Sequence, residues 1–505
     1  MSSESARTED ALLVVGFKAL TSALVLAAGF RALSDDDYAR IVIAQGFAQA
    51  PKLDPSGTSW LPFPFWLTGS AMALFGDSVQ TARAVAVLSG IVASLLVWTA
   101  AHWLGVSRRG ALLAAMVASV FPYAAWLGVA TVPESLTAAL MLLGLAGVSS
   151  DGAPRRWLGA AALAVACASR YEAWPVAAVF ALLLVLDAVR ARDPRKLLPA
   201  LLAVAAPLGW MLYGATSRGS ALFFVKRVAD YQRAIGAGGD PLLLDLVRAP
   251  AAIVRAEPEL IAITVVAVVA ADYLGIRGWA ARYRRVGLGL LALLAFLIAG
   301  DVRDSSATHH AERTLLAIWF AAAVLFGDLA PRVLRKSKAG THAVIVAAGT
   351  FAFVGATTMI RPWFARRDSF IDRSAQLAIG AQARTLGASR ANPLVIDTPD
   401  FAFYAVIAGA GGPAIARPLS DRDPRKEKEA DPFASSQSLR ERLTLENARW
   451  LVVTGAAHTH LAAEIGSEHG RARDLTLFAI PPELETPVAH LDRFHVGPPR
   501  KRIAP

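Results

Sequence analysis

Long apolar runs constrain this sequence more than any other feature, because about 20 apolar residues suffice to cross a bilayer as a helix. The chain of 505 residues is 55% hydrophobic and only 18% charged, whereas a soluble protein is about a quarter charged. It therefore predicts a polytopic α-helical membrane protein with about 11 transmembrane helices, and it excludes disordered and low-complexity classes. The eleven runs lie at residues 11–33, 84–105, 110–129, 134–149, 157–170, 173–189, 197–216, 259–275, 286–300, 314–329 and 341–360.

Charged residues divide the chain into two parts. Residues 361–505 contain 20 Lys and Arg and 17 Asp and Glu, whereas residues 1–360 contain only the remaining 31 basic and 23 acidic residues. The sequence thus predicts a transmembrane domain at 1–360, with a first outer loop at 34–83, and a soluble C-terminal domain at 361–505. A single cysteine, Cys167, excludes an intramolecular disulfide.

Basic residues alternate from loop to loop along the membrane part. Five connections contain 16 Lys and Arg between them, and eleven spans allow all five to lie in the cytoplasm, as the positive-inside rule expects. The net charge of +11 then reflects membrane orientation, and we expect no nucleic-acid partner. We predict an integral protein of a bacterial-type inner or plasma membrane. Its N-terminus is cytoplasmic, its first span is retained rather than cleaved, and its C-terminal domain is extracytoplasmic.

Three adjacent carboxylates, Asp35, Asp36 and Asp37, follow the first span. Their mutual repulsion raises the proton affinity of at least one of them, and the cluster also forms a site for a cation. A general base or a metal ligand at the membrane surface is one interpretation. The alternative is helix capping, in which Ser34 or Asp35 caps a helix over about 36–50 and the acids lie at its positive end.

A Pro-rich aromatic segment, residues 60–66, follows and continues into an apolar stretch ending at Phe75-Gly76. About 14 apolar residues are too few to cross a bilayer. Prolines and tryptophans are typical of an interfacial segment. We therefore predict interfacial helices in the first outer loop rather than another span.

Several short motifs follow one another in a characteristic order between residues 34 and 172. They are Asp35-Asp36-Asp37-Tyr38, Leu61-Pro62-Phe63-Pro64, Phe75-Gly76-Asp77, Arg83, Val132-Pro133-Glu134-Ser135 and Ser169-Arg170-Tyr171-Glu172. Their order over about residues 1–360 resembles the GT-C superfamily of membrane glycosyltransferases. The pattern is most similar to the family 39-like branch of protein O-mannosyltransferases and aminoarabinose transferases.

The resemblance implies transfer of a sugar from a polyprenyl-phosphate donor on the outer side of the membrane. A carboxylate deprotonates the acceptor hydroxyl, and the phosphate departs from the anomeric carbon with inversion. Asp36 is the first choice for this general base, followed by Asp37, with Asp35 also a candidate. Glu134 is a second active-site acid, or alternatively a favourable charge at a helix N-terminus.

A departing phosphate needs cationic neighbours. We predict that the donor or its phosphate is bound by Arg170, Tyr171, Glu172, Lys226, Arg227, His309, His310 and Arg313. Arg170 alternatively forms a structural ion pair with Glu172 or Glu134, or extends to the lipid headgroups. Lys226 and Arg227 lie in an amphipathic segment, 223–233, that alternatively binds membrane lipids. A divalent metal, if any, would be bound by Asp36, Glu134 or His310.

The C-terminal domain alternates between short apolar runs and helical segments. Residues 393–397, 449–454 and 475–480 predict strands and residues 404–408 a helix, so we expect a small α/β domain with a partly parallel sheet. Gly409-Ala410-Gly411-Gly412 does not follow a strand as a dinucleotide-binding loop would, and we interpret it as a plain loop. The domain either recognises the acceptor or covers the membrane site.

Two other functional classes compete with a glycosyltransferase. A transporter or flippase of polyprenyl-linked sugars would need ionisable residues at mid-bilayer and broken helices, whereas here the ionisable residues gather at the span ends. A non-catalytic membrane scaffold would keep its activity when the outer aspartates are replaced. The sequence does not identify the sugar, or whether the acceptor is a protein, a lipid or a glycan.

Overall fold

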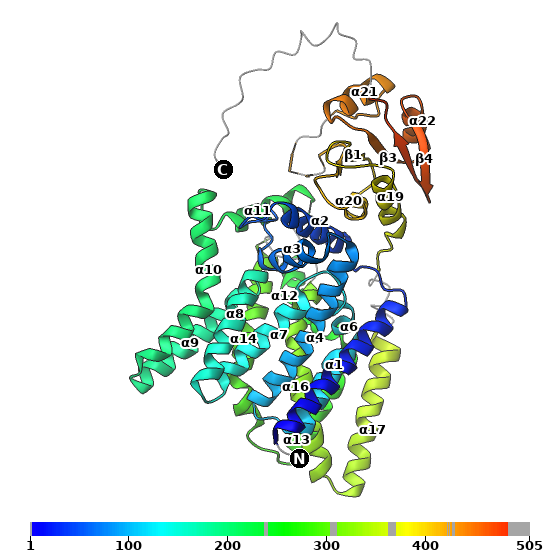
Figure 1. Ribbon diagram of the computed structural model, residues 1–505. Helices are drawn as coiled ribbons and strands as arrows, with labels where there is room; N and C mark the ends of the chain where they lie inside the picture. Colours follow the sequence, from blue (N-terminus) through cyan, green and yellow to red (C-terminus); the bar gives the residue numbers. More distant parts are fainter. Residues whose placement is uncertain are drawn as a thin grey trace.

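The computed structural model consists of a long helical bundle with a small sheet domain above one end of it (Figure 1). The structure describes residues 3–236, 241–303, 311–361, 370–421, 423, 425–426 and 430–482. The helices up to residue 360 are α1 (Ser3–Ala27), α2 (Asp35–Gln49), α3 (Phe63–Phe75), α4 (Val79–Trp103), α5 (Arg108–Val120), α6 (Pro122–Leu127), α7 (Glu134–Ser149), α8 (Ala153–Ser169), α9 (Ala173–Ala191), η1 (Pro194–Lys196), α10 (Leu197–Ser217), α11 (Phe223–Ala234), α12 (Leu242–Ala256), α13 (Pro258–Tyr273), α14 (Trp279–Val302), α15 (Ala311–Thr314), α16 (Leu316–Lys336), α17 (Ala339–Gly355) and η2 (Ala356–Ile360).

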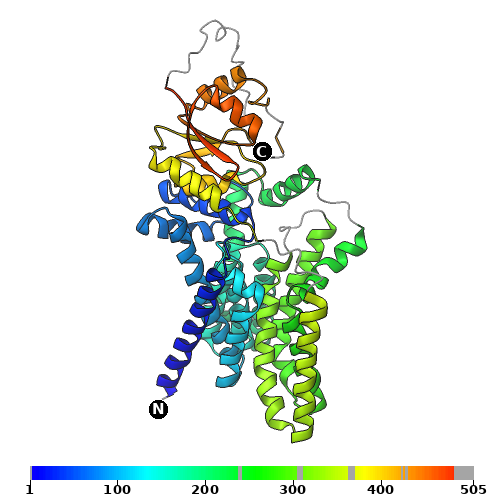
Figure 2. The same cartoon turned by 90° about the vertical axis from the view of Figure 1, so that its right-hand side faces the viewer.

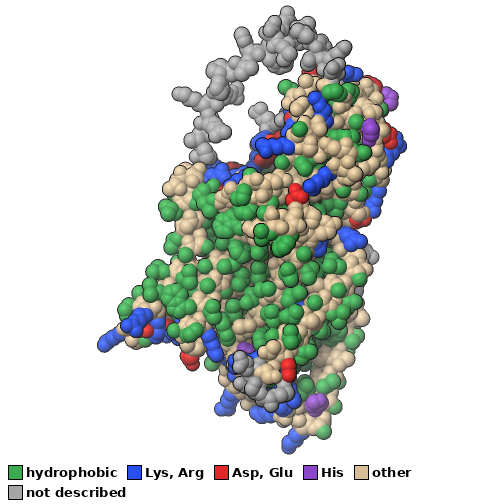
Figure 3. Space-filling model, viewed as in Figure 1, with side chains coloured by type: hydrophobic (Ala, Val, Ile, Leu, Met, Phe, Trp, Pro, Cys, Tyr) green, Lys and Arg blue, Asp and Glu red, His purple; other side chains and the backbone are tan. Residues whose placement is uncertain are grey.

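Each of the eleven predicted runs overlaps with helical structure. Seven helices in the described residues are long and apolar enough to cross a membrane: α1, α4, α9, α10 with η1, α14, α16 and α17 with η2. Hydrophobic side chains cover most of the visible bundle surface, and basic residues gather at its lower end (Figure 3). The protein is therefore an integral membrane protein, as predicted.

The four remaining predicted spans are helices of at most 17 residues, and for two of them the structure shows a physical reason. Run 110–129 is divided into α5 and α6 by Pro122, which has no N–H to continue the helix. Helix α7 is buried along almost its whole length by neighbouring helices. It therefore contacts protein rather than lipid, and it does not need the full length of a lipid-exposed span. The Lys18 ammonium of α1 donates a 3.0 Å hydrogen bond to the Ala124 carbonyl beside the break.

The C-terminal domain is an α/β domain, as predicted. Its five strands have the order β2-β1-β3-β5-β4, in which β1 is parallel to β2 and β3, and β5 is antiparallel to β3 and β4. The elements are α19 (Ser374–Thr385), β1 (Leu394–Ile396), α20 (Phe403–Ala410), β2 (Ala416–Pro418), α21 (Ser436–Leu445), β3 (Trp450–Thr454), α22 (Ala456–Ala463), β4 (Ser467–Ala472) and β5 (Leu475–Ala479).

The three predicted strands correspond to β1, β3 and β5, whereas the two edge strands were not predicted. Strand β2 is three residues long and ends in a proline, and β4 is almost wholly polar, so neither has a buried-strand pattern. The predicted Gly-rich loop is partly wrong, because Gly409 and Ala410 still belong to α20. Gly411 ends that helix in the left-handed region with a φ of 95°, which favours glycine.

Helices α2 and α3 lie between the bundle and the sheet domain (Figures 1 and 2). They confirm the predicted helix after the acidic cluster and the short helix of the first outer loop. The Gln45 amide of α2 donates to the carbonyls of Ala408, at 3.0 Å, and Asp77, at 2.8 Å, and Gln49 donates to the Gly411 carbonyl. One side of α2 is therefore attached to the sheet domain.

Candidate active site

A cavity of about 610 Å³ lies between the helical bundle and the sheet domain. Its floor and walls come from the start of α2, the loop 58–61, the start of α7, the α8–α9 junction, α11 and α15. Its roof comes from described residues of the C-terminal domain between Phe401 and Arg425. The predicted site residues that line the cavity are Asp35, Asp36, Glu134, Arg170, Tyr171, Glu172, Arg227 and Arg313.

The three adjacent aspartates face three different environments. Asp35 accepts two hydrogen bonds from Arg373, each of 2.9 Å. Asp36 keeps 42% of its side chain exposed and lies 3.5 Å from the buried guanidinium of Arg313. Arg313 is held in place by a 2.9 Å hydrogen bond to the Ser34 hydroxyl. Of the three carboxylates, Asp36 is the most accessible from the cavity.

Asp37 is buried and does not line the cavity. Its carboxylate accepts hydrogen bonds from the backbone N–H groups of Leu33, Ser34 and Thr131. Burial raises the pKa of Asp37, against the opposing effects of the Arg313 and Arg83 charges and of the N–H donors. Ser34, one of the two predicted caps, is the N-cap residue of α2, and Asp37 at the third helical position accepts from its N–H. The carboxylate that takes part in capping is therefore Asp37, whereas Asp35 was the predicted one.

Arg170 lies between two buried carboxylates. Its guanidinium is 2.7 Å from Glu134 and 2.6 Å from Glu172, and all three side chains are largely buried. One oxygen of Glu134, Oε2, has no hydrogen-bond partner in the described structure. The geometry matches the structural ion pair that the sequence left open as the alternative for Arg170. Its predicted role in donor binding stays a prediction.

Arg40 belongs to the site although it was not among the predicted residues. It is 8% exposed and lies on α2 one helical turn after Asp36. Its guanidinium lies 4.5 Å from the ring centre of Trp60 and 5.8 Å from that of Phe65. This i, i+4 spacing, which places Arg40 on the same helix face as Asp36, is the sequence signal that could have identified it.

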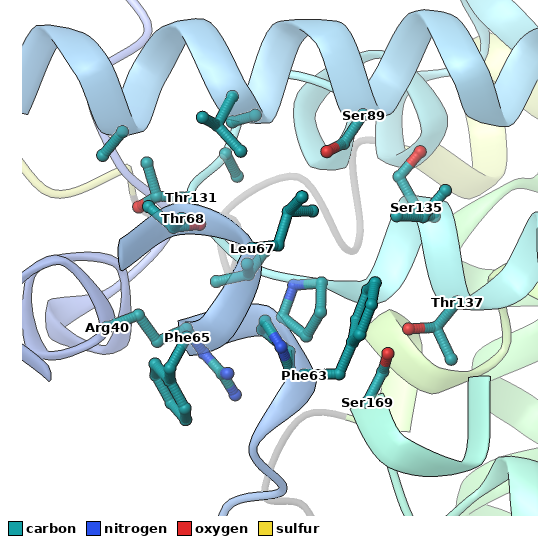
Figure 4. Close-up of a pocket in the computed structure, with 18 of the residues that line it drawn as sticks. Arg40, Phe63, Phe65, Leu67, Thr68, Ser89, Thr131, Ser135, Thr137 and Ser169 are labelled. Atoms are coloured by element: carbon teal, nitrogen blue, oxygen red, sulfur yellow. The ribbon is translucent and has the colours of Figure 1, made fainter. Parts of the chain in front are cut away.

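A second, small cavity of about 50 Å³ lies behind Arg40, between α2, α3, α4 and α7. Figure 4 shows Arg40 next to Phe65 on one side of it, with Thr137 and Ser169 on the other side. Arg40 and Ser169 line both cavities. The Thr137 hydroxyl is buried and has no hydrogen-bond partner in the described structure. Arg40 thus separates the large cavity from a smaller one that has mixed polar and apolar walls.

Only some of the other predicted donor-binding residues reach the cavity. Tyr171 stacks on Phe224 of α11, with 4.5 Å between the ring centres, and its hydroxyl accepts a hydrogen bond from Trp210. Arg227 of α11 reaches the cavity, whereas Lys226 is not among the lining residues. His309 and His310 lie outside the described residues. Within the described part of the chain, no group of three or more His, Cys, Asp and Glu could hold a metal ion.

The roof of the cavity was not predicted residue by residue, because it comes from a separate domain. Phe401, Phe403 and Tyr404 contribute aromatic rings, and Asp423 and Arg425 contribute charges. Burial raises the pKa of Tyr404, and the nearby Tyr231 and Asp36 act in the same direction. The roof therefore combines rings with charges of both signs, and its tyrosine lies within electrostatic reach of Asp36.

Fold and site together define a polytopic membrane protein whose polar, charged cavity lies beneath a soluble domain. The family model for dolichyl-phosphate-mannose-protein mannosyltransferases matches residues 56–212. The matched segment contains most of the motifs by which the sequence resembles the protein O-mannosyltransferases. A search of curated proteins found no match.

Solved structures of similar fold include two of ArnT from Cupriavidus metallidurans. The form bound to undecaprenyl phosphate has 14% sequence identity and a TM-score of 0.58, and the match covers 96% of this chain and 100% of that one. The apo form has 15% identity and a TM-score of 0.58, covering 94% of this chain and 99% of that one. At these identities the likeness concerns the fold, including the presence of both a bundle and a C-terminal domain.

Proposed function

We propose that this protein transfers a sugar from a polyprenyl-phosphate-linked donor to an acceptor hydroxyl, with Asp36 as the general base. The observation that carries the proposal is the position of Asp36. Its carboxylate is accessible in the cavity, whereas the adjacent Asp35 is paired with Arg373 and Asp37 is buried at the helix N-terminus. The family match to mannosyltransferases that use a lipid-linked sugar supports this donor class.

The reaction is a single displacement at the anomeric carbon. The acceptor oxygen forms a bond to that carbon while the bond to the donor phosphate oxygen breaks, and the configuration inverts. The phosphate leaves with the bonding electron pair, and Asp36 takes the acceptor proton. Such a base contributes about 10²–10⁴-fold to the rate. The guanidinium of Arg313 lies 3.5 Å from the Asp36 carboxylate.

The donor side of the proposal draws support from the relative bound to undecaprenyl phosphate, which shares this fold. A lipid tail can stay in the bilayer beside the bundle while the sugar and phosphate occupy the cavity at its end. We place this cavity on the extracytoplasmic face of a bacterial inner or plasma membrane. The basic loops support that orientation, and the N-terminus lies at the end of the bundle far from the sheet domain (Figure 1).

Transfer from radiolabelled polyprenyl-phosphate sugars in purified membranes tests the proposal. Asp36→Asn is expected to lower the transfer rate by about 10²–10⁴-fold. Asp230→Asn is a matched control, because Asp230 lies on the nearby α11, pairs with the exposed Arg233 and does not line the cavity. Wild-type rates in Asp36→Asn would contradict the assignment, and movement of intact donor without transfer would indicate a flippase.

Acceptor and metal are tested in the same membranes. Protein, lipid and glycan fractions are offered separately, and the fraction that gains the label identifies the acceptor class. A divalent metal at Asp36, Glu134 or His310 stays a prediction. Chelation followed by addition of single divalent cations tests it, because a required metal restores the rate that chelation removes.

A further inference from the structure

We propose that Arg40 is the residue that binds the phosphate of the lipid-linked donor, and of the lipid phosphate left after transfer. This inference rests on the proposed function and extends it to the leaving group. It concerns a residue that none of the motifs of the first outer loop singled out. Its basis is a buried positive charge that makes no ion pair with any described residue.

Arg40 makes no hydrogen bond or ion pair with any residue that the structure describes, although only 8% of it is exposed. Burial lowers the pKa of the Arg40 guanidinium, while Glu134 and Asp36 oppose this effect from a distance. Taking an ion out of water is costly unless it gains a partner of opposite charge. A chain that keeps such a charge at the wall of a cavity therefore provides a site for an anionic ligand.

Two other arginines that line the cavity, Arg170 and Arg313, have partners within the protein. Arg170 is bound by Glu134 and Glu172, and Arg313 contacts Ser34 and Asp36. A ligand that used Arg170 would have to displace an ion pair. Two lining arginines make no hydrogen bond or ion pair with the residues that the structure describes, and of these Arg40 is buried whereas Arg227 of α11 is only half-buried.

The surroundings of Arg40 orient its guanidinium without neutralising it. The indole of Trp60 lies over the group, at 4.5 Å from ring centre to Cζ, and the ring of Phe65 lies farther away. Aromatic faces attract a guanidinium through its π face and leave the N–H groups at its edge free. A planar edge with several N–H donors matches two oxygens of a phosphate.

The position of Arg40 on α2 fits the displacement chemistry. Asp36 and Arg40 are four residues apart, and side chains at this spacing start about 5–6 Å from each other on one helix face. In an inverting displacement the base and the leaving group lie on opposite sides of the anomeric carbon. A sugar bound between the two side chains would have the acceptor near Asp36 and the phosphate near Arg40.

Binding of undecaprenyl phosphate to the purified full-length protein in detergent, measured by native mass spectrometry, tests the inference without any transfer assay. Arg40→Gln is expected to raise the Kd by about 10- to 100-fold, because hydrogen bonds to a charged group are lost. Arg40→Lys should lie between this variant and the wild type, since it keeps the charge but not the planar fork. Undecaprenol, which lacks the phosphate, should bind the wild type and Arg40→Gln equally.

Arg233→Gln is the matched control, because Arg233 is exposed and paired with Asp230 on α11. It should bind undecaprenyl phosphate within about twofold of the wild type. If Arg40→Gln does not fold, Trp60→Leu provides a second test, since loss of the cation–π contact should weaken phosphate binding several-fold. Unchanged phosphate binding in the folded Arg40 and Trp60 variants would overturn the inference.

The same design separates this inference from the proposed function. Absence of sugar transfer in the wild type would contradict the glycosyltransferase proposal. A phosphate-dependent affinity that is lost in Arg40→Gln would still support the anion site. Conversely, normal transfer with an unchanged donor KM in Arg40→Gln would support the glycosyltransferase proposal and overturn the proposed role of Arg40.

Discussion

Arg373 donates two hydrogen bonds, each of 2.9 Å, to the carboxylate of Asp35, and so connects the C-terminal domain to the first residue of α2. The two residues are 338 positions apart in the chain. Asp36, the proposed base, is the next residue. The orientation of the base therefore depends on how the C-terminal domain packs on α2. The Arg373–Asp35 ion pair is thus a contact that positions the base, and not only a surface salt bridge.

Breaking this pair should lower the rate more than the affinity. We expect Arg373→Ala and Asp35→Asn each to lower kcat for transfer by about 10-fold, because hydrogen bonds to a charged group contribute about 1.5–3 kcal/mol. The donor KM should change little, since neither residue is proposed to touch the phosphate. A double-mutant cycle on kcat provides the measurement, and the double variant should be no worse than either single one. Fully additive losses would mean that the two side chains act independently.

Arg170 provides a second test, because a structural ion pair and a phosphate ligand respond differently to substitution. Removing one partner of a buried pair leaves an uncompensated charge and costs about 3–5 kcal/mol. We expect Arg170→Met to lower the unfolding temperature in detergent strongly, while Arg170→Met combined with Glu134→Gln and Glu172→Gln regains part of the loss. Thermal unfolding followed by circular dichroism measures this.

The contrary outcome for Arg170 is equally specific. If Arg170→Met unfolds at the wild-type temperature and instead raises the donor KM, then Arg170 is a phosphate ligand. The ion pair seen here would then be one that the donor displaces.

Glu257 should make the stability of the bundle depend on pH. It lies at the α12–α13 junction, where it accepts a hydrogen bond from the Tyr123 N–H, lies 3.4 Å from Arg361 and has Glu259 nearby. Burial raises the pKa of Glu257 from 4.5 to about 8, in spite of the opposing effects of the Tyr123 N–H and Arg361. Its folded form thus holds a proton that its unfolded form releases.

The sign follows from this difference in proton binding. The stabilisation is complete below pH 4.5, declines as the pH rises and is lost as the pH passes about 8. Glu257→Gln cannot titrate, so its unfolding temperature should fall less than that of the wild type between pH 5 and pH 9. Thermal unfolding of both proteins across this range checks the prediction, and parallel pH profiles would contradict it.

Local sequence features predicted the parts of the site that depend on neighbouring residues. The acidic cluster predicted a helix start, and Asp37 now accounts for the capping while Asp36 is left accessible. For Arg170 the sequence offered an ion pair with Glu172 or Glu134 as the alternative to phosphate binding, and both pairs form. The edge strands β2 and β4 were missed because an edge strand can be short or polar and still complete a sheet.

By itself the sequence determined that the chain is a helical membrane protein with a soluble α/β domain, and which end of each span has the ionisable residues. These are properties of composition and local order, since an apolar run avoids water wherever it lies in the fold. Only the tertiary structure decided that Asp35 pairs with Arg373, that the C-terminal domain covers the cavity and that Arg40 is buried without an ion pair to any described residue. Burial and ion pairing depend on which distant segments meet, and a buried charge becomes informative only when all its neighbours are in place.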